Sequence, residues 1–278
     1  MAIAPRVTVV IPAWDSYVSD RLIEAVDSVQ AQAIPTELIV VDNASAVRLP
    51  QLPCARVVRL ARRCSLGAAR NAALAHVRTP YVVFLDADDV LLPGALDALV
   101  KGVQAERGRA LYVLSILDAA TGRRHRSPRR LARAVSRHPR VFALANSVWS
   151  LLPTQGCAIM RTADVLACGG YAACDHGEDW VLGTSLAFRG SVAFDRRLGL
   201  RYRTRPDSPG SGPLSGRVLV ENARRVRARI RADPAIPKWE RHALPLIAVA
   251  QWGAARLAHP IYRSVREFHL AGTGIRSG

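Results

Sequence analysis

Short apolar runs alternate with longer amphipathic segments through the first part of the chain. The runs predict buried strands because aliphatic and β-branched residues follow one another without helical spacing. The predicted strands are 7–11, 37–41, 56–60, 81–85 and 111–116. The predicted helices between them are 19–32, 66–76 and 93–103. Strands joined by helix-length crossovers are typical of a mostly parallel sheet flanked by helices, so the pattern predicts an α/β fold.

The alternation stops near residue 118. Residues 118–150 have little apolar periodicity and contain an arginine-rich stretch at 123–140, which predicts a basic surface insert. A strand at 156–160 and a helix at 181–188 then resume the pattern.

Polar residues interrupt the segment that follows. Apolar runs at 191–194 and 198–202 predict a pair of short strands, and the Pro, Ser and Gly residues of 206–216 predict a flexible loop. The remainder has helical character. We therefore predict one domain over residues 1–205, followed by the loop and a C-terminal helical extension over 206–278.

Two carboxylates stand directly after the strand at 81–85, in the tripeptide Asp86-Ala87-Asp88. Residues one apart on an extended chain point to opposite sides, so one carboxylate can face a nucleotide and the other a divalent cation. Ligands of open α/β sheets bind at the carboxyl ends of the strands. An isolated acid pair of this kind is also common in ordinary turns and helix caps. Other motifs of the chain are therefore needed to distinguish a binding site from a turn.

Composition narrows the class of protein. Half of the 278 residues are hydrophobic, which allows a large core and argues against a disordered chain. The five cysteines form no CxxC pair, so neither a zinc site nor a disulfide framework is predicted. No signal peptide and no apolar stretch of membrane-spanning length is found, so we expect a cytoplasmic protein, with peripheral contact to a membrane left open.

The net charge is +17, and all but two of the 39 basic residues are arginines. This charge favours polyanionic partners: nucleotide diphosphates, phosphorylated acceptors, nucleic acid or an anionic membrane. Codon bias in a GC-rich genome would give the same composition. Only 6% of residues are aromatic and none interleaves with the arginines of 123–140, which argues against a nucleic-acid-binding protein.

Five segments resemble, in order, the motifs of the family 2 glycosyltransferases, which have the GT-A fold. They are Val9–Trp14, Val40–Ser45, Gly67–Asn71, Phe84–Asp89, and Gly169–Tyr171 followed by Gly177–Asp179. The resemblance covers residues 6–205. It implies a Rossmann-like GT-A domain that transfers a sugar from a nucleotide-sugar donor and inverts the anomeric configuration.

The resemblance also implies roles for the acidic strand ends. The last aspartate of the DXD motif, Asp88, would bind Mn²⁺ or Mg²⁺, and Asp86 would lie towards the ribose or sugar, with Ala87 between them. Asp42 would accept a hydrogen bond from the imide N–H of uracil or thymine, which implies a UDP- or dTDP-sugar. An Asx-turn is the ordinary alternative for an isolated aspartate at this place.

Further donor contacts are implied at the first strand and at the ARN segment. Pro12, Ala13 and Trp14 would line the nucleotide, with Trp14 stacking on the base. Trp14 and Asp15 depart from the family pattern, which has tyrosine and asparagine there. Arg70 would approach the nucleotide or the diphosphate, or form an ion pair with Asp42 or Asp86.

The acid pair Glu178-Asp179 is the implied catalytic element. Asp179 would be the general base that takes the proton of the acceptor hydroxyl or amine, and Glu178 would orient Asp179 or bind acceptor hydroxyls. Both residues would also favour a helix N-terminus through the helix dipole alone.

One departure concerns the diphosphate. Many family members have Tyr-Arg-x-His where this chain has Tyr202-Arg-Thr-Arg205. Arginine does not ligate a metal but can grip a diphosphate, so Arg203 or Arg205 would supplement the cation. The loop at 206–216 would then be a lid over the donor or a plain linker.

A second enzyme class and several kinds of acceptor are also considered from the sequence. A sugar-1-phosphate nucleotidyltransferase on a related fold would have a glycine-rich loop after the first strand, and this chain has Ile11–Trp14 there. The acceptor is not identified, and anionic, small-molecule and lipid-linked acceptors are all compatible with the sequence. Its recognition would fall in residues 118–155 or in the C-terminal helices. The oligomeric state is not predicted.

Overall fold

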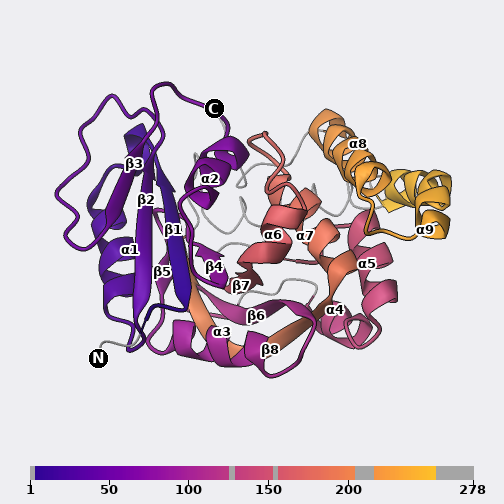
Figure 1. Ribbon diagram of the computed structural model, residues 1–278, viewed down its shortest axis with the longest axis horizontal. Helices are drawn as coiled ribbons and strands as arrows, with labels where there is room; N and C mark the ends of the chain where they lie inside the picture. The colour runs from indigo at the N-terminus through magenta and orange to yellow at the C-terminus, as the bar shows by residue number, and fades with distance from the viewer. Residues whose placement is uncertain (1–3, 125–128, 153–155, 204–215, 255–278) are drawn as a thin grey trace, which may run out of the picture.

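The apolar runs of the sequence become the strands of one curled sheet in the computed structural model, which describes residues 4–124, 129–152, 156–203 and 216–254 (Figure 1). In the described residues the strand order is β3-β2-β1-β4-β7-β6-β8-β5. The strands are β1 (Val7–Ala13), β2 (Thr36–Asp42), β3 (Arg56–Arg59), β4 (Tyr81–Phe84), β5 (Val90–Leu91), β6 (Arg109–Asp118), β7 (Ala158–Arg161) and β8 (Ser191–Tyr202).

Most neighbouring strands run parallel. β3, β2, β1 and β4 form one parallel block, and β6 pairs with β8 in parallel. β7 lies antiparallel between β4 and β6, and the short β5 is antiparallel to β8 at the edge. Every residue of β1 is buried, as expected for a strand covered on both faces. The predicted α/β class with a mostly parallel sheet flanked by helices is confirmed.

Helices flank this sheet and cover its apolar surfaces. They are α1 (Asp20–Gln30), α2 (Leu66–Leu74), α3 (Ala95–Gln104), α4 (Arg129–Val135), α5 (Pro139–Val148), α6 (Thr162–Ala167), α7 (Glu178–Arg189), α8 (Gly216–Ala232) and α9 (Lys238–His242). α1 buries Leu22, Ala25, Val26 and Val29, which recur at helical spacing. Directly after α1, the Gln32 amide donates to the Leu92 carbonyl and accepts the Leu96 N–H, which fastens α1 beside α3.

The prediction of two short strands at 191–194 and 198–202 is wrong, because one continuous strand, β8, spans both. The polar residues Asp195–Arg197 suggested a turn. In the structure Asp195 stays in the strand, where its carboxylate accepts the Tyr112 hydroxyl at 2.6 Å. Register shifts between β6 and β8 around Val113 and Ser115 absorb the irregularity.

The predicted basic insert is only partly a surface excursion. Its second half forms α5, which buries Phe142 and Ala143 and packs against α7. The Asn146 side chain donates to the Thr184 hydroxyl at 3.0 Å, so α5 is tied to α7 by a buried polar contact as well. The arginines around residue 130 hid a short amphipathic pattern that begins only at Pro139.

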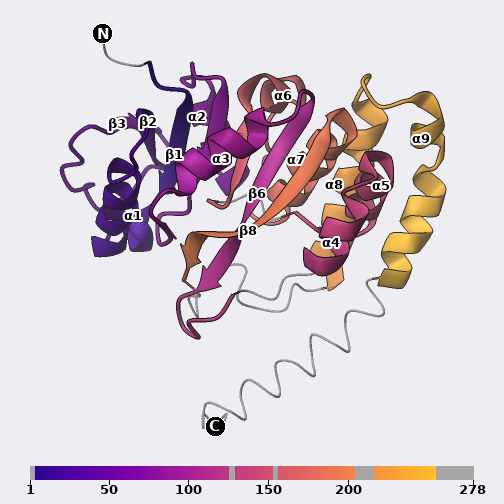
Figure 2. The same cartoon turned by 90° about the horizontal axis from the view of Figure 1, so that it is seen from below.

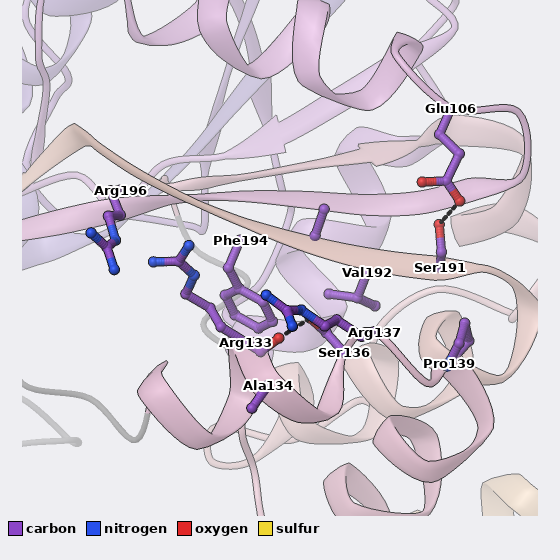
Figure 3. Close-up of a pocket in the computed structure, with 11 residues that line it drawn as sticks. Glu106, Arg133, Ala134, Ser136, Arg137, Pro139, Ser191, Val192, Phe194 and Arg196 are labelled. Carbon is purple, nitrogen blue, oxygen red and sulfur yellow. Dashed lines mark hydrogen bonds between the residues drawn. The ribbon is translucent and has the colours of Figure 1, made fainter.

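Arginines of the insert line a pocket away from the strand ends that carry the acid pairs. An open pocket of about 640 Å³ is lined by Arg133 of α4, Arg137 just after α4, and Arg196 of β8, together with Phe194 (Figure 3). The β8 residues of this pocket belong to the amino-terminal half of the strand. Arg133 and Arg137 therefore do not face the tripeptide that ends at Asp88.

The C-terminal helices form a second, smaller apolar cluster. Val226 and Ile230 of α8 pack with Trp180 and Val181 of α7, and Leu244 joins them. Figures 1 and 2 show α8 and α9 at the end of the molecule opposite β1–β3. None of the helices in the described part of the chain has the length and apolar character needed to cross a membrane.

Candidate active site

The carboxyl ends of the central strands bring several sequence-predicted residues to one edge of the sheet. Ala13 and Asp42 are register partners at the ends of β1 and β2. β4 continues this edge, because the Leu85 N–H donates to the Val10 carbonyl of β1 at 2.9 Å. Asp86 follows Leu85 directly. The edge is the ligand-binding side of an open α/β sheet.

Arg70 joins two of the predicted acidic motifs. Its guanidinium lies fully buried and donates to Asp86 at 2.8 Å and to Glu178 at 2.6 Å. Of the two ion-pair partners considered from the sequence, Asp86 is the one observed, and Asp42 pairs elsewhere. Arg70 therefore connects the end of β4 with the first turn of α7.

Residues of the same α2 motif hold Arg70 in this position. Gly67 donates its N–H to the Cys174 carbonyl at 3.1 Å, and a Cβ on Gly67 would collide with the Ala172 carbonyl oxygen. Asn71 exchanges two hydrogen bonds with the backbone of Tyr171, at 2.9 Å and 2.8 Å. Glycine and asparagine thus let α2 approach the 171–174 segment closely enough for the arginine between them to point inward.

The charges of this network perturb one another. Burial acts to lower the pKa of Arg70, but attraction to Asp86 and Glu178 outweighs it and raises that pKa above its ordinary value. Burial and then repulsion from Asp179 raise the pKa of Glu178 to about 7, although Arg70 acts in the opposite direction. The ring of Tyr171 lies beneath the guanidinium, 5.1 Å from its carbon to the ring centroid. Arg70 therefore stays cationic, whereas the pKa of Glu178 lies close to neutral pH.

Glu178 and Asp179 differ in their access to solvent. Both lie in the first turn of α7, which begins after Gly177 in the left-handed conformation, three residues earlier than the sequence predicted. Glu178 is buried against Arg70, whereas Asp179 is half-buried and accepts the Trp180 N–H at 2.7 Å. Asp179 is thus the member of the pair that a bound molecule can reach.

The pH dependence of stability tests the environment of Glu178. Its folded-state pKa of about 7 exceeds the ordinary 4.5, so between these values the folded protein holds a proton that the unfolded chain has released. The contribution of Glu178 to stability therefore falls as the pH rises through this window, by on the order of 3 kcal/mol. We expect urea denaturation, repeated at several pH values between 4.5 and 7, to give a free energy of unfolding that falls less with rising pH for Glu178→Gln than for the wild type.

The matched control for this titration is Glu221→Gln. Glu221 is exposed on α8 and pairs with Arg225 there. This variant should keep the wild-type dependence on pH. Parallel curves for the wild type and Glu178→Gln would show that the glutamate at the start of α7 does not have a raised pKa.

Three carboxylates crowd the turn after β4. Asp88 and Asp89 are buried, and Asp89 accepts the Arg203 N–H on Oδ1 at 2.9 Å. Its Oδ2 is buried without a hydrogen-bond partner among the described residues. Burial and the charge of Asp86 raise the pKa of Asp89 well above its ordinary value. The turn is thus rich in oxygen atoms that could bind a cation.

This donor set fits the divalent cation that the family resemblance implies. Hard oxygen ligands suit Mg²⁺ and Mn²⁺. In the described part of the chain, no three His, Cys, Asp or Glu side chains are grouped so as to hold a metal ion by themselves. A cation held by Asp88 would therefore complete its coordination with phosphate oxygens and water, as Mg²⁺ usually does.

Arg203 reaches the same turn but is already paired. Its guanidinium donates to the Asp88 carbonyl at 3.4 Å and forms an ion pair with Glu24 of α1. Arg205, the other arginine predicted to hold the diphosphate, lies outside the described residues, as does nearly all of the predicted loop at 206–216.

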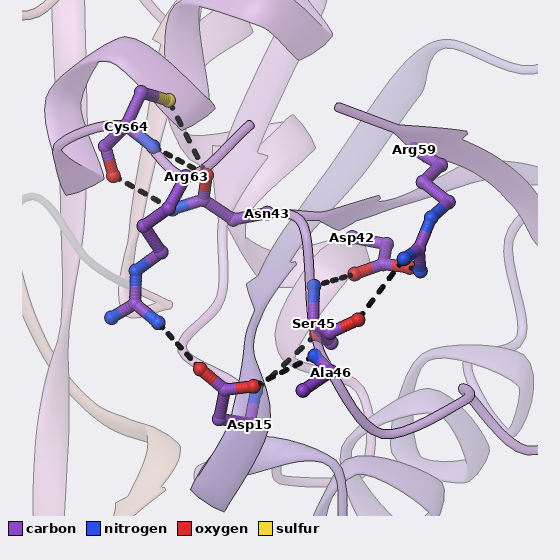
Figure 4. Close-up of polar contacts among 8 residues, drawn as sticks. All are labelled: Asp15, Asp42, Asn43, Ser45, Ala46, Arg59, Arg63 and Cys64. Atoms are coloured by element: carbon purple, nitrogen blue, oxygen red, sulfur yellow. Dashed lines mark hydrogen bonds and ion pairs between the residues drawn. The ribbon is translucent and has the colours of Figure 1, made fainter. Parts of the chain in front are cut away.

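Asp42 lies at the neighbouring strand end and is enclosed by polar contacts (Figure 4). Its side chain is 3% exposed, accepts the Ser45 N–H at 2.8 Å on Oδ1 and pairs with Arg59 on Oδ2. The sequence analysis missed Arg59. The signal was available, because Asp42 and Arg59 end adjacent parallel strands and are register partners.

A second arginine covers the predicted stacking residue. The Arg63 guanidinium lies over the Trp14 ring, 4.8 Å from its centroid, and donates to Asp15 at 2.8 Å. Asp15 also accepts the Ala46 N–H at 2.9 Å (Figure 4), which ties the end of β1 to the loop after β2. Asp15 therefore has structural partners, and a base that stacked on Trp14 would share its ring with a cation.

The small residues of the predicted donor site are placed at the strand ends but have no exposed side chains. Pro12, Ala13 and Ala87 are all buried. The Ala13 carbonyl already accepts the Asn43 N–H at 2.9 Å. These positions can therefore shape the edge of the sheet and offer backbone atoms, but not side-chain contacts.

Comparisons with known proteins indicate the family to which the chain belongs. Residues 8–168, more than half of the chain, match the model of the family described as glycosyl transferase family 2. The succinoglycan biosynthesis protein ExoO of Rhizobium meliloti (strain 1021) is 33% identical over 124 residues, which cover 42% of this chain and 34% of ExoO. The chain thus matches about a third of the length of this curated relative.

Solved structures of S. aureus TarS have the same fold. The complex of TarS 1–349 with UDP-GlcNAc superposes with a TM-score of 0.67 at 16% identity, over 89% of this chain and 71% of that one. The complex with UDP gives 0.64 at 15% identity, over 89% and 70%. At such identities the likeness concerns the fold alone. The family match over more than half of the chain shows that the chain belongs to glycosyl transferase family 2.

Proposed function

We propose that the protein is an inverting glycosyltransferase that moves a sugar from a UDP- or dTDP-sugar to an acceptor hydroxyl or amine. The observation that carries this proposal is the buried bridge from Asp86 through Arg70 to Glu178. The bridge connects the strand end that would hold the donor with the helix turn that carries Asp179. These ion pairs would hold the donor-binding strand end and the helix turn with the base at a fixed separation.

In the proposed reaction Asp179 is the general base. It takes the proton of the acceptor as the acceptor oxygen or nitrogen attacks the anomeric carbon from the face opposite the nucleotide. The new bond to the anomeric carbon forms as its bond to the phosphate oxygen breaks, and the nucleoside diphosphate leaves with the bonding electrons. A single displacement of this kind inverts the anomeric configuration.

Glu178 and Arg70 would act by positioning. Arg70 is fully buried, so it does not grip the diphosphate directly and instead holds Asp86 and Glu178 in place. Glu178, whose pKa is raised to about 7 by burial and by Asp179, carries only part of a negative charge at neutral pH. Asp179, the half-buried carboxylate of the pair, accepts the proton.

Asp88 would hold the divalent cation. When bound, the cation supplies Lewis-acid stabilisation of the negative charge that develops on the leaving diphosphate. The crowding of Asp86, Asp88 and Asp89, with the unpartnered buried Oδ2 of Asp89, supports a cation at this turn.

The Asp42–Arg59 pair supports a uracil or thymine base. The imide edge of these bases presents one N–H donor flanked by two carbonyl acceptors. A carboxylate next to a guanidinium offers the complementary acceptor and donor, and cytosine lacks the N–H that Asp42 would bind. The UDP and UDP-GlcNAc complexes of the TarS neighbours agree with this choice of donor.

For the acceptor, we propose a saccharide, either free or lipid-linked. The matched relative is described as a succinoglycan biosynthesis protein, which supports a saccharide acceptor. A nucleotidyltransferase remains the second candidate, but the ordered segment Ile11–Trp14 replaces the glycine-rich loop that such an enzyme needs.

A thermal-shift experiment tests the donor and the cation together. We expect UDP or dTDP with Mn²⁺ to raise the unfolding temperature, and CDP and GDP to have much smaller effects. Asp88→Asn should lose most of the Mn²⁺-dependent part of the shift, because one carboxylate ligand of the cation is removed. Asp97→Asn, on the surface of α3, is the matched control.

Each part of the proposed function would be contradicted by a different result. Equal shifts by all four nucleotides would overturn the assignment of base recognition to Asp42. A UDP shift that persists in full with EDTA would overturn the metal role of Asp88. Pyrophosphate release from a nucleoside triphosphate and a sugar phosphate would favour the nucleotidyltransferase.

A further inference from the structure

Four large apolar side chains stand exposed on the C-terminal helices, and we call them the C-terminal patch. They are Trp239, Leu246, Val249 and Trp252, with exposed fractions of 53%, 74%, 68% and 58%. They fall within 14 residues of the sequence, whereas the other exposed large hydrophobics are scattered over the chain. A concentration of exposed apolar side chains on a folded protein marks an interaction surface.

The patch is not an unfinished part of the core. The chain is helical from residue 244 to 254, and Leu244, Ile247 and Gln251 face inward. Leu244 and Ile247 pack in the cluster with α8, and the Gln251 amide donates to the Ser147 carbonyl of α5 at 2.7 Å. Leu246 and Val249 lie between these positions, on the outer surface of the helix. The helix therefore has one face packed and one apolar face exposed.

Arginines lie beside the patch helix and beside Trp239, and we call them the arginine border. Arg224, Arg227 and Arg231 recur at helical spacing along α8, and the Arg227 guanidinium donates to the Gln251 side chain, which brings this stripe next to the patch helix. Burial, and then the charges of Arg224 and Arg231, lower the pKa of Arg227, as expected for cations held together. On the other side, the Arg140 guanidinium lies 6.0 Å from the centroid of Trp239.

The acidic residues of the same region are withdrawn from the surface. Asp233 is buried and paired with Arg189, and Glu240 is buried. Glu221 is exposed but pairs with Arg225. The outward charge between residues 216 and 254 is therefore basic, with apolar side chains beside it.

We propose that the C-terminal patch and its arginine border bind the surface of an anionic lipid bilayer. Tryptophan and aliphatic side chains insert into the boundary between headgroups and acyl chains, and flanking arginines contact the lipid phosphates. The described helices are too short and too polar to span a bilayer, so the contact is with its surface. This inference does not depend on the proposed transfer reaction.

Vesicle flotation with the full 278-residue chain tests the proposal. The chain should float with vesicles of phosphatidylcholine and phosphatidylglycerol and much less with phosphatidylcholine alone, and added salt should weaken the binding. Leu246→Ser with Val249→Ser should weaken binding by about tenfold or more. Arg224→Glu with Arg231→Glu should abolish the preference for anionic vesicles.

Two matched double variants serve as controls. Leu166→Ser with Val57→Ser removes one exposed leucine and one exposed valine elsewhere, and Arg6→Glu with Arg107→Glu reverses two exposed charges at distant positions. Both should bind like the wild type, and unfolding temperatures should show that all variants are folded.

Three results would overturn the proposal. The first is a wild-type chain that does not bind anionic vesicles. The second is unchanged binding by Leu246→Ser with Val249→Ser. The third is a dimer in light scattering that this double variant converts to a monomer without any change in vesicle binding, which would make the patch a contact between two copies of the chain.

Discussion

Asp179→Asn is expected to lower the turnover number by about 10²- to 10⁴-fold, because asparagine cannot accept the proton of the acceptor. Its affinity for UDP or dTDP with Mn²⁺ should stay close to the wild-type value, since Asp179 lies on α7 and not at the strand ends that would hold the nucleotide. Release of nucleoside diphosphate in the presence of acceptor measures the first quantity. Isothermal titration with UDP measures the second.

Asp97→Asn is the control for this experiment, because it removes a carboxylate whose partner is Lys101 on the surface of α3. It should keep the wild-type rate. Near-normal turnover by Asp179→Asn would contradict its role as the base. A loss of nucleotide binding as large as the loss of turnover would instead point to a general disturbance of α7.

Arg70→Met is expected to reduce the free energy of unfolding by about 3–5 kcal/mol, because it leaves Glu178 buried, and Asp86 partly buried, without their shared cation. Urea denaturation at neutral pH measures this loss. Methionine replaces the unbranched apolar part of the arginine side chain, so the loss reports mainly on the guanidinium and its charge. Turnover should fall as well, since both acidic motifs lose their common anchor.

Arg63→Met is the matched control for the loss of an arginine. Arg63 and Asp15 are each about half exposed, so their ion pair should contribute no more than about 1 kcal/mol. Adding Glu178→Gln to Arg70→Met should recover part of the lost stability, because one unpaired buried charge disappears. A loss below about 1 kcal/mol for Arg70→Met would mean that solvent reaches the two carboxylates.

Local patterns predicted the elements well where one pattern held without interruption. The strands β1, β2 and β4 each contain a run of mostly apolar residues and were located to within two residues. β8 was divided in two because Asp195 and its neighbours look like a turn, and their acceptance in a strand depends on Tyr112, far away in the sequence. α5 was hidden for a related reason, since its burial depends on α7.

The prediction of the site was limited in the same way, because it did not include contacts between residues far apart in the sequence. The acid pairs and Arg70 were identified from motifs, and pairing of Arg70 with Asp86 was one of two alternatives. Its second partner, Glu178, is 108 residues away, and no local pattern reports such a contact. The position of Arg59 beside Asp42 depends on the register of two parallel strands, which a single sequence leaves open until the strand ends are known.

The close approach at Gly67 has a consequence for anyone who engineers this enzyme. A library that varies the residues around α7 could include the 171–176 segment, which directly precedes that helix. The Ala172 carbonyl sits where any larger side chain on Gly67 would have to go, and Leu66 donates its N–H to Asp175 at 2.9 Å. Changes to the backbone of 171–176 will therefore shift α2 and, with it, Arg70 and its partner Asp86. Side-chain substitutions in that segment will disturb this network less than insertions or deletions in it.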